Sequence, residues 1–271
     1  MECRPDQLAA LHAVLHAPPS QYGLARSRWR LQDLSQALPA LASYQLGSLS
    51  RLLKRLGITL RRGRYRQTSP DPAYQQKLEL LTRLEGLVRR HPERARLLYL
   101  DEFTLHIQPD LGARFSSPGV EPVATPAFGW PRYYRYAGAL DVHSGQLVWR
   151  TGRSMGTQNL ERFLRQLRRV YPGERLFVVW DNWPPHHHVR LQATARQLGI
   201  RLLYLPTDAP WTNPIEQLWR WLKQTLLHHH RLADRPAELH DQVNTWLDQF
   251  QGPSPHLLRY AGLLPDARLP D

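Results

Sequence analysis

Residues 176–182, Leu-Phe-Val-Val-Trp-Asp-Asn, form an apolar run that ends in an acid, and this pattern is the strongest indication of the fold class. Residues 97–102, Leu-Leu-Tyr-Leu-Asp-Glu, end in the same way. Short runs that are apolar throughout are typical of strands buried inside a sheet. Ligands of open α/β sheets gather at the carboxyl ends of the strands. We therefore expect neighbouring strands to bring Asp101 and Asp181 together.

Strand-like and helix-like segments alternate around these two runs. The hydrophobic patterns predict the following elements in chain order: strands over 97–100, 134–142 and 146–150, a helix near 157–170, a strand over 176–180, a helix over 189–198, a strand over 201–205 and a helix from 213 to 226. A turn at 143–145 would join the second and third strands. This order predicts an α/β domain on a mixed sheet over residues 96–271, an arrangement that resembles ribonuclease H.

Positive charge is concentrated in the first third of the chain. The 271 residues carry 36 basic and 23 acidic side chains, a net charge of +13. Residues 1–100 hold 17 basic and 7 acidic side chains, which leaves 19 and 16 for the rest. This distribution indicates that the N-terminal part grips a polyanion such as DNA. The codon composition of a GC-rich genome is the alternative explanation for the preference for arginine over lysine.

The N-terminal part reads as a helix-turn-helix domain over residues 1–67. The pattern predicts a helix over 30–38, a stop at Pro39, and a second helix with Ser43 as its N-cap and Gly57 as its end. In this motif the second helix enters the major groove. The alternating basic stretch after Gly57 predicts a winged-helix-like extension on the phosphate backbone. The residues expected to contact DNA are Tyr44, Gln45, Ser48, Arg51, Lys54, Arg61, Arg62, Arg64 and Arg66. An ordinary helical hairpin with a solvated basic face is the alternative.

Residues 68–95 are expected to be a linker and a connecting helix. Ser69-Pro70-Asp71-Pro72 reads as a turn or linker, and an amphipathic helix follows it up to Pro92.

Composition excludes several classes of protein. The single cysteine, Cys3, excludes a disulfide framework and any site with several thiolate ligands. No apolar run approaches the roughly 18 residues that span a bilayer. The first residues, which include Glu2 and Asp6, lack the leader of a secreted protein. The sequence thus predicts a cytoplasmic protein that has no membrane partner.

A third acid, Glu216, begins a helix. Asn213-Pro214-Ile215-Glu216 reads as N-cap, N1, N2 and N3. Three carboxylates that converge would repel one another unless they held divalent cations, and oxygen ligands suit Mg²⁺ or Mn²⁺. Two such ions can activate water and stabilise the leaving oxygen in phosphodiester cleavage.

Simpler explanations remain open at this point. A strand-end aspartate often forms a turn, and a glutamate at N3 often only caps its helix. Glu102, Asp141 and Asp208 are rival acids that the pattern does not eliminate.

The motifs together resemble the DDE transposases, in particular the bacterial insertion-sequence branch of the Tc/mariner superfamily. The resemblance is carried by Leu100-Asp101-Glu102, Trp180-Asp181-Asn182 with Pro185-His186, Tyr204-Leu205-Pro206, Asn213-Pro214-Ile215-Glu216 and Trp219-Arg220-Trp221-Leu222-Lys223. The 34 residues between Asp181 and Glu216 match that superfamily. The resemblance covers nearly the whole chain from about residue 26.

The resemblance implies both an activity and roles for residues. It selects Asp101, Asp181 and Glu216 as catalytic residues and metal ligands, and Glu102, Asn182, His186 and Asn213 as supporting residues. It implies Mg²⁺-dependent cleavage at transposon ends, strand transfer into target DNA at TA sites, and a homodimer in the DNA complex. Members of the superfamily usually carry two helix-turn-helix units, and only one is recognised in this sequence.

Two other functions are weighed against the transposase. One is a non-catalytic or truncated copy that competes for transposon ends, and the other is a structure-selective nuclease of ribonuclease H type. The histidines at 228–230 are expected at the end of the Glu216 helix, where the helix dipole favours them.

Overall fold

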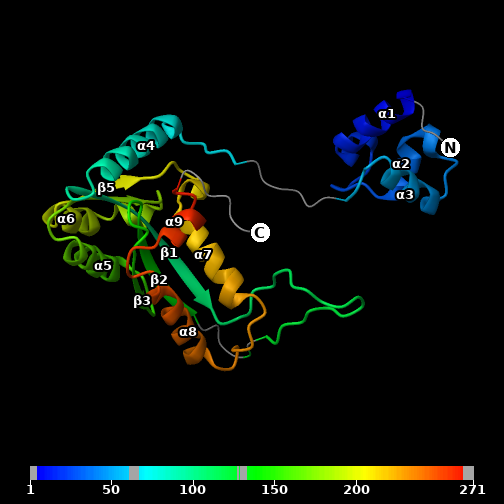
Figure 1. Ribbon diagram of the computed structural model, residues 1–271. Helices are drawn as coiled ribbons and strands as arrows, with labels where there is room; N and C mark the ends of the chain where they lie inside the picture. Colours follow the sequence, from blue (N-terminus) through cyan, green and yellow to red (C-terminus); the bar gives the residue numbers. More distant parts are fainter. Residues whose placement is uncertain (1–4, 61–66, 127, 129–132, 265–271) are drawn as a thin grey trace. The chain divides into compact units, whose positions relative to one another are not determined.

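The computed structural model describes residues 5–60, 67–126, 128 and 133–264. The chain divides into two units, residues 1–65 and 66–271, which are described separately below (Figure 1). No helix within the described ranges is long and apolar enough to cross a membrane.

The N-terminal unit is built of helices alone in its described part. They are α1 (Pro5–His16), α2 (Leu31–Ala37) and α3 (Leu46–Arg55), with 3₁₀ turns at Pro19–Tyr22 and Pro39–Leu41. Their apolar faces meet in one small core, formed by Leu11, Val14, Leu34, Leu41, Leu49, Leu52 and Leu53. The sequence patterns did not predict α1. This helix completes the core in which α2 and α3 bury their leucines.

The second helix begins later than its pattern predicted. Ser43 is not its N-cap: the N–H of Tyr44 donates to the carbonyl of Leu41, and this turn delays the start of α3 until Leu46. Tyr44 and Gln45 therefore precede the helix. Residues 58–60 form no strand, so the described part of the expected wing is irregular. Arg61, Arg62, Arg64 and Arg66 lie outside the described residues.

The C-terminal unit is built on a mixed five-stranded sheet. The strands are β1 (Ala95–His106), β2 (Tyr133–Asp141), β3 (Leu147–Gly152), β4 (Arg175–Trp180) and β5 (Ile200–Tyr204). Their order is β3-β2-β1-β4-β5. The pairs β1–β2 and β2–β3 are antiparallel, whereas β1–β4 and β4–β5 are parallel. Parallel pairs need a crossover between the strands, and here helices supply it.

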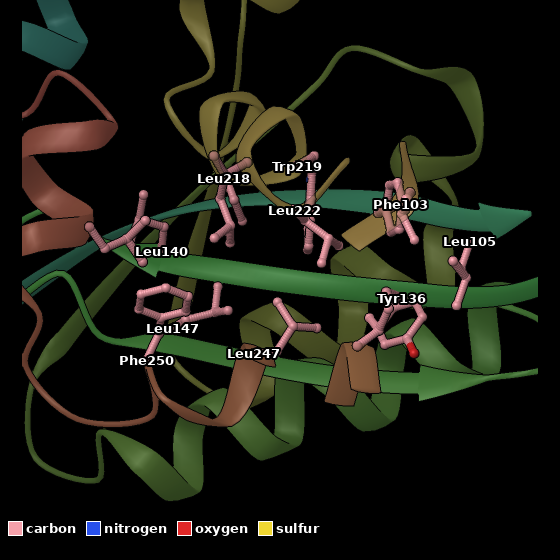
Figure 2. Close-up of a cluster of buried hydrophobic side chains, with 14 of the residues drawn as sticks. Phe103, Leu105, Tyr136, Leu140, Leu147, Leu218, Trp219, Leu222, Leu247 and Phe250 are labelled. Atoms are coloured by element: carbon pink, nitrogen blue, oxygen red, sulfur yellow. The ribbon is translucent and has the colours of Figure 1, made fainter. Parts of the chain in front are cut away.

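Helices cover both faces of this sheet. On one face lie α5 (Thr157–Val170) and α6 (Val189–Gln197), and on the other α4 (Tyr74–Arg90), α7 (Ile215–Leu222), α8 (Pro236–Asp248) and α9 (Pro255–Tyr260) (Figure 1). Figure 2 shows the cluster beneath α7, where Phe103 and Tyr136 of the sheet meet Leu218 and Trp219 of the helix. The predicted α/β domain on a mixed sheet is confirmed.

The end of the Glu216 helix differs from its prediction. The α-helix stops at Leu222 and a π-helical turn, Lys223–Leu227, follows it. His228 is extended, and the N–H of His229 donates to the carbonyl of Asp110 over 2.9 Å. The Nε2 atom of His229 lies 2.6 Å from the carbonyl oxygen of Gly112. The prediction that these histidines lie at a helix end, where the helix dipole favours them, is therefore wrong. His228 and His229 instead attach the chain after α7 to the chain after β1.

Candidate active site

Asp101 and Asp181 lie at equivalent positions on neighbouring parallel strands. Tyr99 of β1 pairs with Val179 of β4, and each acid comes two residues later. Parallel strands run about 4.8 Å apart, so this register sets the two carboxylate-bearing residues side by side. The sequence predicted that the two acids meet, with both at strand ends; Asp181 does follow the end of β4, whereas β1 continues to His106 and Asp101 lies inside it.

The Asp101 carboxylate is held by a tryptophan of α7. The Nε1–H of Trp219 donates to Oδ2 of Asp101 over 3.1 Å. Burial raises the pKa of Asp101 well above its usual range, and the negative charges of Glu216, Glu102 and Asp181 raise it further. Asp101 therefore shares one electrostatic environment with both other acids of the predicted triad.

Glu216 stands in the first turn of α7, as the sequence predicted. Burial raises the pKa of Glu216, while the positive charges of Lys223 and Arg220 act in the opposite direction. Asn213 does not cap this helix: Pro214 is the N-cap, and the buried Asn213 side chain turns away to donate to the Leu100 carbonyl over 3.2 Å. Asn213 thus joins the start of α7 to β1 just before Asp101.

His186 lies between two acids. Its ring stacks on Trp180 at 4.0 Å, its Nδ1 contacts Oδ1 of Asp181, and its Nε2 lies 3.3 Å from Oε2 of Glu102. Burial alone would lower the pKa of His186, but the two carboxylates outweigh it and raise that pKa to about 9. In return, His186 lowers the pKa of Asp181 despite the opposing effect of burial. The histidine therefore carries a positive charge near neutral pH and acts as an internal counter-ion.

Of the three rival acids, Asp141 and Asp208 lie apart from Asp101, Asp181 and Glu216, whereas Glu102 is their neighbour. Side chains alternate along a strand, so Glu102 points to the opposite face of β1 from Asp101, where it reaches Trp180. Asp141 is fully buried and accepts hydrogen bonds from His143 N–H, Ser144 Oγ and Arg96 in the turn between β2 and β3. Asp208 is exposed in a loop at a φ of 52°. Glu102 is thus linked to Asp181 by His186, which contacts both carboxylates. Asp141 and Asp208 make no such contact and have separate surroundings.

The donor set of this group fits a hard divalent cation. Asp101, Asp181 and Glu216 offer carboxylate oxygens, the ligands that Mg²⁺ prefers. Two further buried oxygens, Oε1 of Glu102 and Oδ1 of Asn213, have no hydrogen-bond partner among the described residues. Within the described ranges, however, no three His, Cys, Asp or Glu side chains are arranged as the ligands of a metal.

Trp219 is the residue of this site that the sequence patterns missed. In the sequence it stands within the motif Trp219-Arg220-Trp221-Leu222-Lys223, to which no role at the site is given. The signal was its spacing, because a residue three positions after Glu216 lies on the same helix face. Gly138 provides the room for it, since a Cβ at this position would lie 2.9 Å from the Trp219 ring.

A concave surface in the N-terminal unit gathers all five described residues that were expected to contact DNA. It is lined by Ser43, Tyr44, Gln45, Ser48, Arg51, Lys54 and Arg55. Its three basic side chains come from α3 and are exposed.

Comparison with known proteins places this group of acids in a family. A family model described as DDE superfamily endonuclease matches residues 96–238. The insertion element IS630 uncharacterized 39 kDa protein of Shigella sonnei is 27% identical over 229 residues, which cover 82% of this chain. The chain spans 65% of the length of that relative.

Solved structures of Mos1 transposase share the fold. The Mos1 paired-end complex with the left transposon end superposes with a TM-score of 0.66 at 18% identity, over 98% of this chain and 76% of that one. The Mos1 mariner paired-end complexes with Mn and with Mg each give a TM-score of 0.61, at 19% and 18% identity, over 96% of this chain and 75% of theirs. This likeness confirms the ribonuclease H-like fold of the C-terminal unit and the helical region before it.

The matched range covers more than half of the chain and contains Asp101, Asp181 and Glu216. The resemblance that the motifs indicated is confirmed, and the chain belongs to the DDE superfamily endonucleases.

Proposed function

We propose that this chain is a divalent-cation-dependent transposase, which cuts the phosphodiester backbone at the ends of an insertion sequence and joins them to target DNA. The observation that carries the proposal is geometric: Asp101 and Asp181 lie side by side on neighbouring strands, and Trp219 of α7, the helix whose first turn carries Glu216, donates a hydrogen bond to Asp101. Family membership and the insertion-element relative support the reaction class. We also propose that the chain inserts the element at TA sites, and this part rests on the resemblance of its motifs to the superfamily alone.

In this proposal Asp101, Asp181 and Glu216 are the residues that would hold Mg²⁺ or Mn²⁺, with two ions shared among the three carboxylates. The bound cations would supply charge stabilisation at the attacking and leaving oxygens of the scissile phosphate. Trp219 donates to Oδ2 of Asp101 and thereby orients this carboxylate. His186 contacts Asp181 and offsets its negative charge.

The N-terminal unit would hold the transposon end. Its concave surface presents Arg51, Lys54 and Arg55 for phosphates, and Gln45 and Ser48 for base edges. The Mos1 complexes contain transposon ends, which supports double-stranded DNA as the partner of this chain.

A homodimer in the DNA complex is part of the proposal. Residues 107–126, between β1 and β2, carry apolar side chains that solvent reaches almost fully, among them Leu111, Phe115 and Val123. Exposed apolar side chains gathered on one segment favour contact with another protein surface.

Cleavage by the full chain tests the proposal. The substrate is a duplex that carries the element's own end, and we expect nicking with Mg²⁺ or Mn²⁺, little with Ca²⁺, and none in excess chelator. Glu216→Gln removes one anionic oxygen donor, so cleavage should fall by a factor of about 100 or more while end binding is retained.

Asp208→Asn is the matched control, because it removes an exposed acid eight residues before Glu216 and asparagine tolerates the positive φ. This variant should cleave like the wild type. Full activity of Glu216→Gln, or cleavage that persists in chelator, would refute the metal-dependent mechanism. A wild-type chain that binds ends but never cuts them would support the non-catalytic competitor instead.

A further inference from the structure

A network of hydrogen bonds connects the segment after the N-terminal unit to the residue that follows Asp181. It begins at Ser69 and Asp71, which the sequence patterns assigned to a linker. The hydroxyl of Ser69 donates to the carbonyl of Thr207, and the N–H of Thr207 donates to Oδ2 of Asp71 over 2.9 Å. These contacts join residues 136 or more positions apart in the chain.

Asp71 is the centre of the first half of this network. Its side chain is 6% exposed, and it also accepts hydrogen bonds from Lys77 Nζ at 2.7 Å and from Ala73 N–H at 2.9 Å. These donors, Lys77 first, lower the pKa of Asp71 to about 2. Lys77 of α4 also donates to the Leu205 carbonyl at 3.3 Å, so the chain just after β5 is held both by α4 and by Asp71, which precedes α4.

Thr207 connects Asp71 to Asn182. Its hydroxyl lies 3.4 Å from Oδ2 of Asp71 and accepts a hydrogen bond from Nδ2 of Asn182 over 2.7 Å. The other end of the Asn182 amide, Oδ1, lies 2.6 Å from Nε2 of His187. Both ends of this amide are therefore occupied, and its orientation is set.

Asn182 directly follows Asp181, where β4 has ended and the backbone turns. The ladder to β5 reaches only Trp180, paired with Tyr204, so beyond this point side chains rather than sheet bonds hold the chain. The N–H of Trp183 donates back to Oδ1 of Asp181 at 3.2 Å, which ties the turn to the carboxylate itself. A change in the Asn182 turn would thus move the Asp181 carboxylate.

We propose that Asp71 and Thr207 are positioning residues for the active site, because they hold Asn182 and thereby the carboxylate of Asp181. This inference rests on the proposed function. According to this proposal, the segment around Asp71, which follows the N-terminal unit in the chain, contributes to DNA cleavage although its side chains do not touch the substrate.

The test compares Thr207→Val with Thr207→Ser in the full chain. Valine matches threonine in shape and removes the hydroxyl, whereas serine keeps it. We expect Thr207→Val to shift the backbone amide NMR signals of Asn182 and Trp183, and the side-chain amide signal of Asn182. The same variant should lower kcat for end cleavage about tenfold and change KM for the DNA less than twofold. Thr207→Ser should restore both the signals and kcat.

Asp71→Asn and Glu79→Gln complete the set. Asp71→Asn keeps one acceptor oxygen but loses the ion pair with Lys77, so its effects should fall between those of Thr207→Ser and Thr207→Val. Glu79 lies exposed on α4 in an ion pair with Arg83, and its variant should match the wild type in every measurement.

Each outcome decides between the alternatives. Unchanged Asn182 signals in Thr207→Val, or a Thr207→Ser variant no better than Thr207→Val, would overturn the positioning role. Shifted signals together with an unchanged kcat would overturn it as well. A wild-type chain without cleavage would be a failure of the proposed function, and the NMR comparison would still show whether Thr207 holds Asn182.

Discussion

At the scale of single residues, the three acids differ because their neighbours differ. Asp181 faces His186, which lowers its pKa, while Asp101 faces other carboxylates and a neutral indole N–H, and its pKa is raised. A carboxylate must lose its proton before it can bind a metal cation. Protons therefore compete with the cation more strongly at the carboxylate with the higher pKa. Asp181 should therefore lose its proton at a lower pH than Asp101.

Trp219→Phe tests the indole contact at Asp101. Phenylalanine keeps the stacking on Phe103 but cannot donate a hydrogen bond to Oδ2. A hydrogen bond to a charged group contributes about 1.5–3 kcal/mol. We expect end cleavage to slow by about 10- to 100-fold, measured as kcat, with little change in DNA affinity.

Trp221→Phe is the control for this prediction. Trp221 packs on Trp246, Phe250 and Tyr260, and among the described residues no hydrogen bond joins it to an acid. Equal losses of activity in the two variants would mean that Trp219 acts only through packing.

At the scale of elements, the site depends on how closely α7 approaches the sheet. Gly138 of β2 pairs with Asp101 of β1, and the Trp219 ring fills the space above it. A strand interior normally disfavours glycine, so its presence here marks a close approach. The same contact that buries Trp219 therefore brings its N–H to Asp101.

Gly138→Ala should destabilise the C-terminal unit by about 1–3 kcal/mol, because the new Cβ overpacks against the Trp219 ring. Urea unfolding measures this loss. Combined with Trp219→Phe, which removes the ring atoms nearest to residue 138, the substitution should cost less than it does alone. Gly152→Ala is the control, since a Cβ at residue 152 would lie 3.5 Å from its nearest neighbour, which leaves room for the methyl group. Strict additivity of the two substitutions would contradict the proposed contact.

Elements were also the level at which the sequence was most informative. The apolar runs predicted where the strands begin, because these are local patterns, but the strand end expected at Asp101 is wrong, since β1 continues through it to His106. The patterns missed α1, in which only Leu11 and Val14 are buried and no wide apolar stripe appears. They also missed the attachment of Asp71 to Thr207 and of Asn213 to Leu100, since both depend on residues more than 100 positions away. Local capping rules described Asn213 wrongly because a tertiary partner competed for its side chain.

At the scale of the whole molecule, charge is divided between the two units. Residues 1–65 hold 10 basic and 3 acidic side chains, so positive charge is densest there, whereas residues 66–271 hold 26 and 20 and contain the three acids of the site. Binding and cutting should therefore respond differently to salt, because binding releases counter-ions from DNA and cutting depends on a local cation site.

Arg51→Ala with Lys54→Ala should flatten the salt dependence of end binding by the full chain. Each phosphate contact contributes about −0.9 to the slope of log K against log salt, so the double variant should lose about 1.8 of that slope. Titrations between low and moderate salt measure it. Arg83→Ala, an exposed position on α4, should leave the slope unchanged. If the double variant keeps the wild-type slope, then Arg51 and Lys54 of α3 do not contact DNA phosphates.

The strand order also has a consequence for synthesis of the chain on the ribosome. The first three strands pair with their neighbours in sequence, whereas β4 joins β1 only after the intervening helix has been made. Domains form as their chain emerges, at about 5–20 residues per second. Glu216 arrives later still, at the start of α7. A nascent chain can therefore complete its N-terminal helices well before its three acids meet, and it would hold DNA before it could cut it.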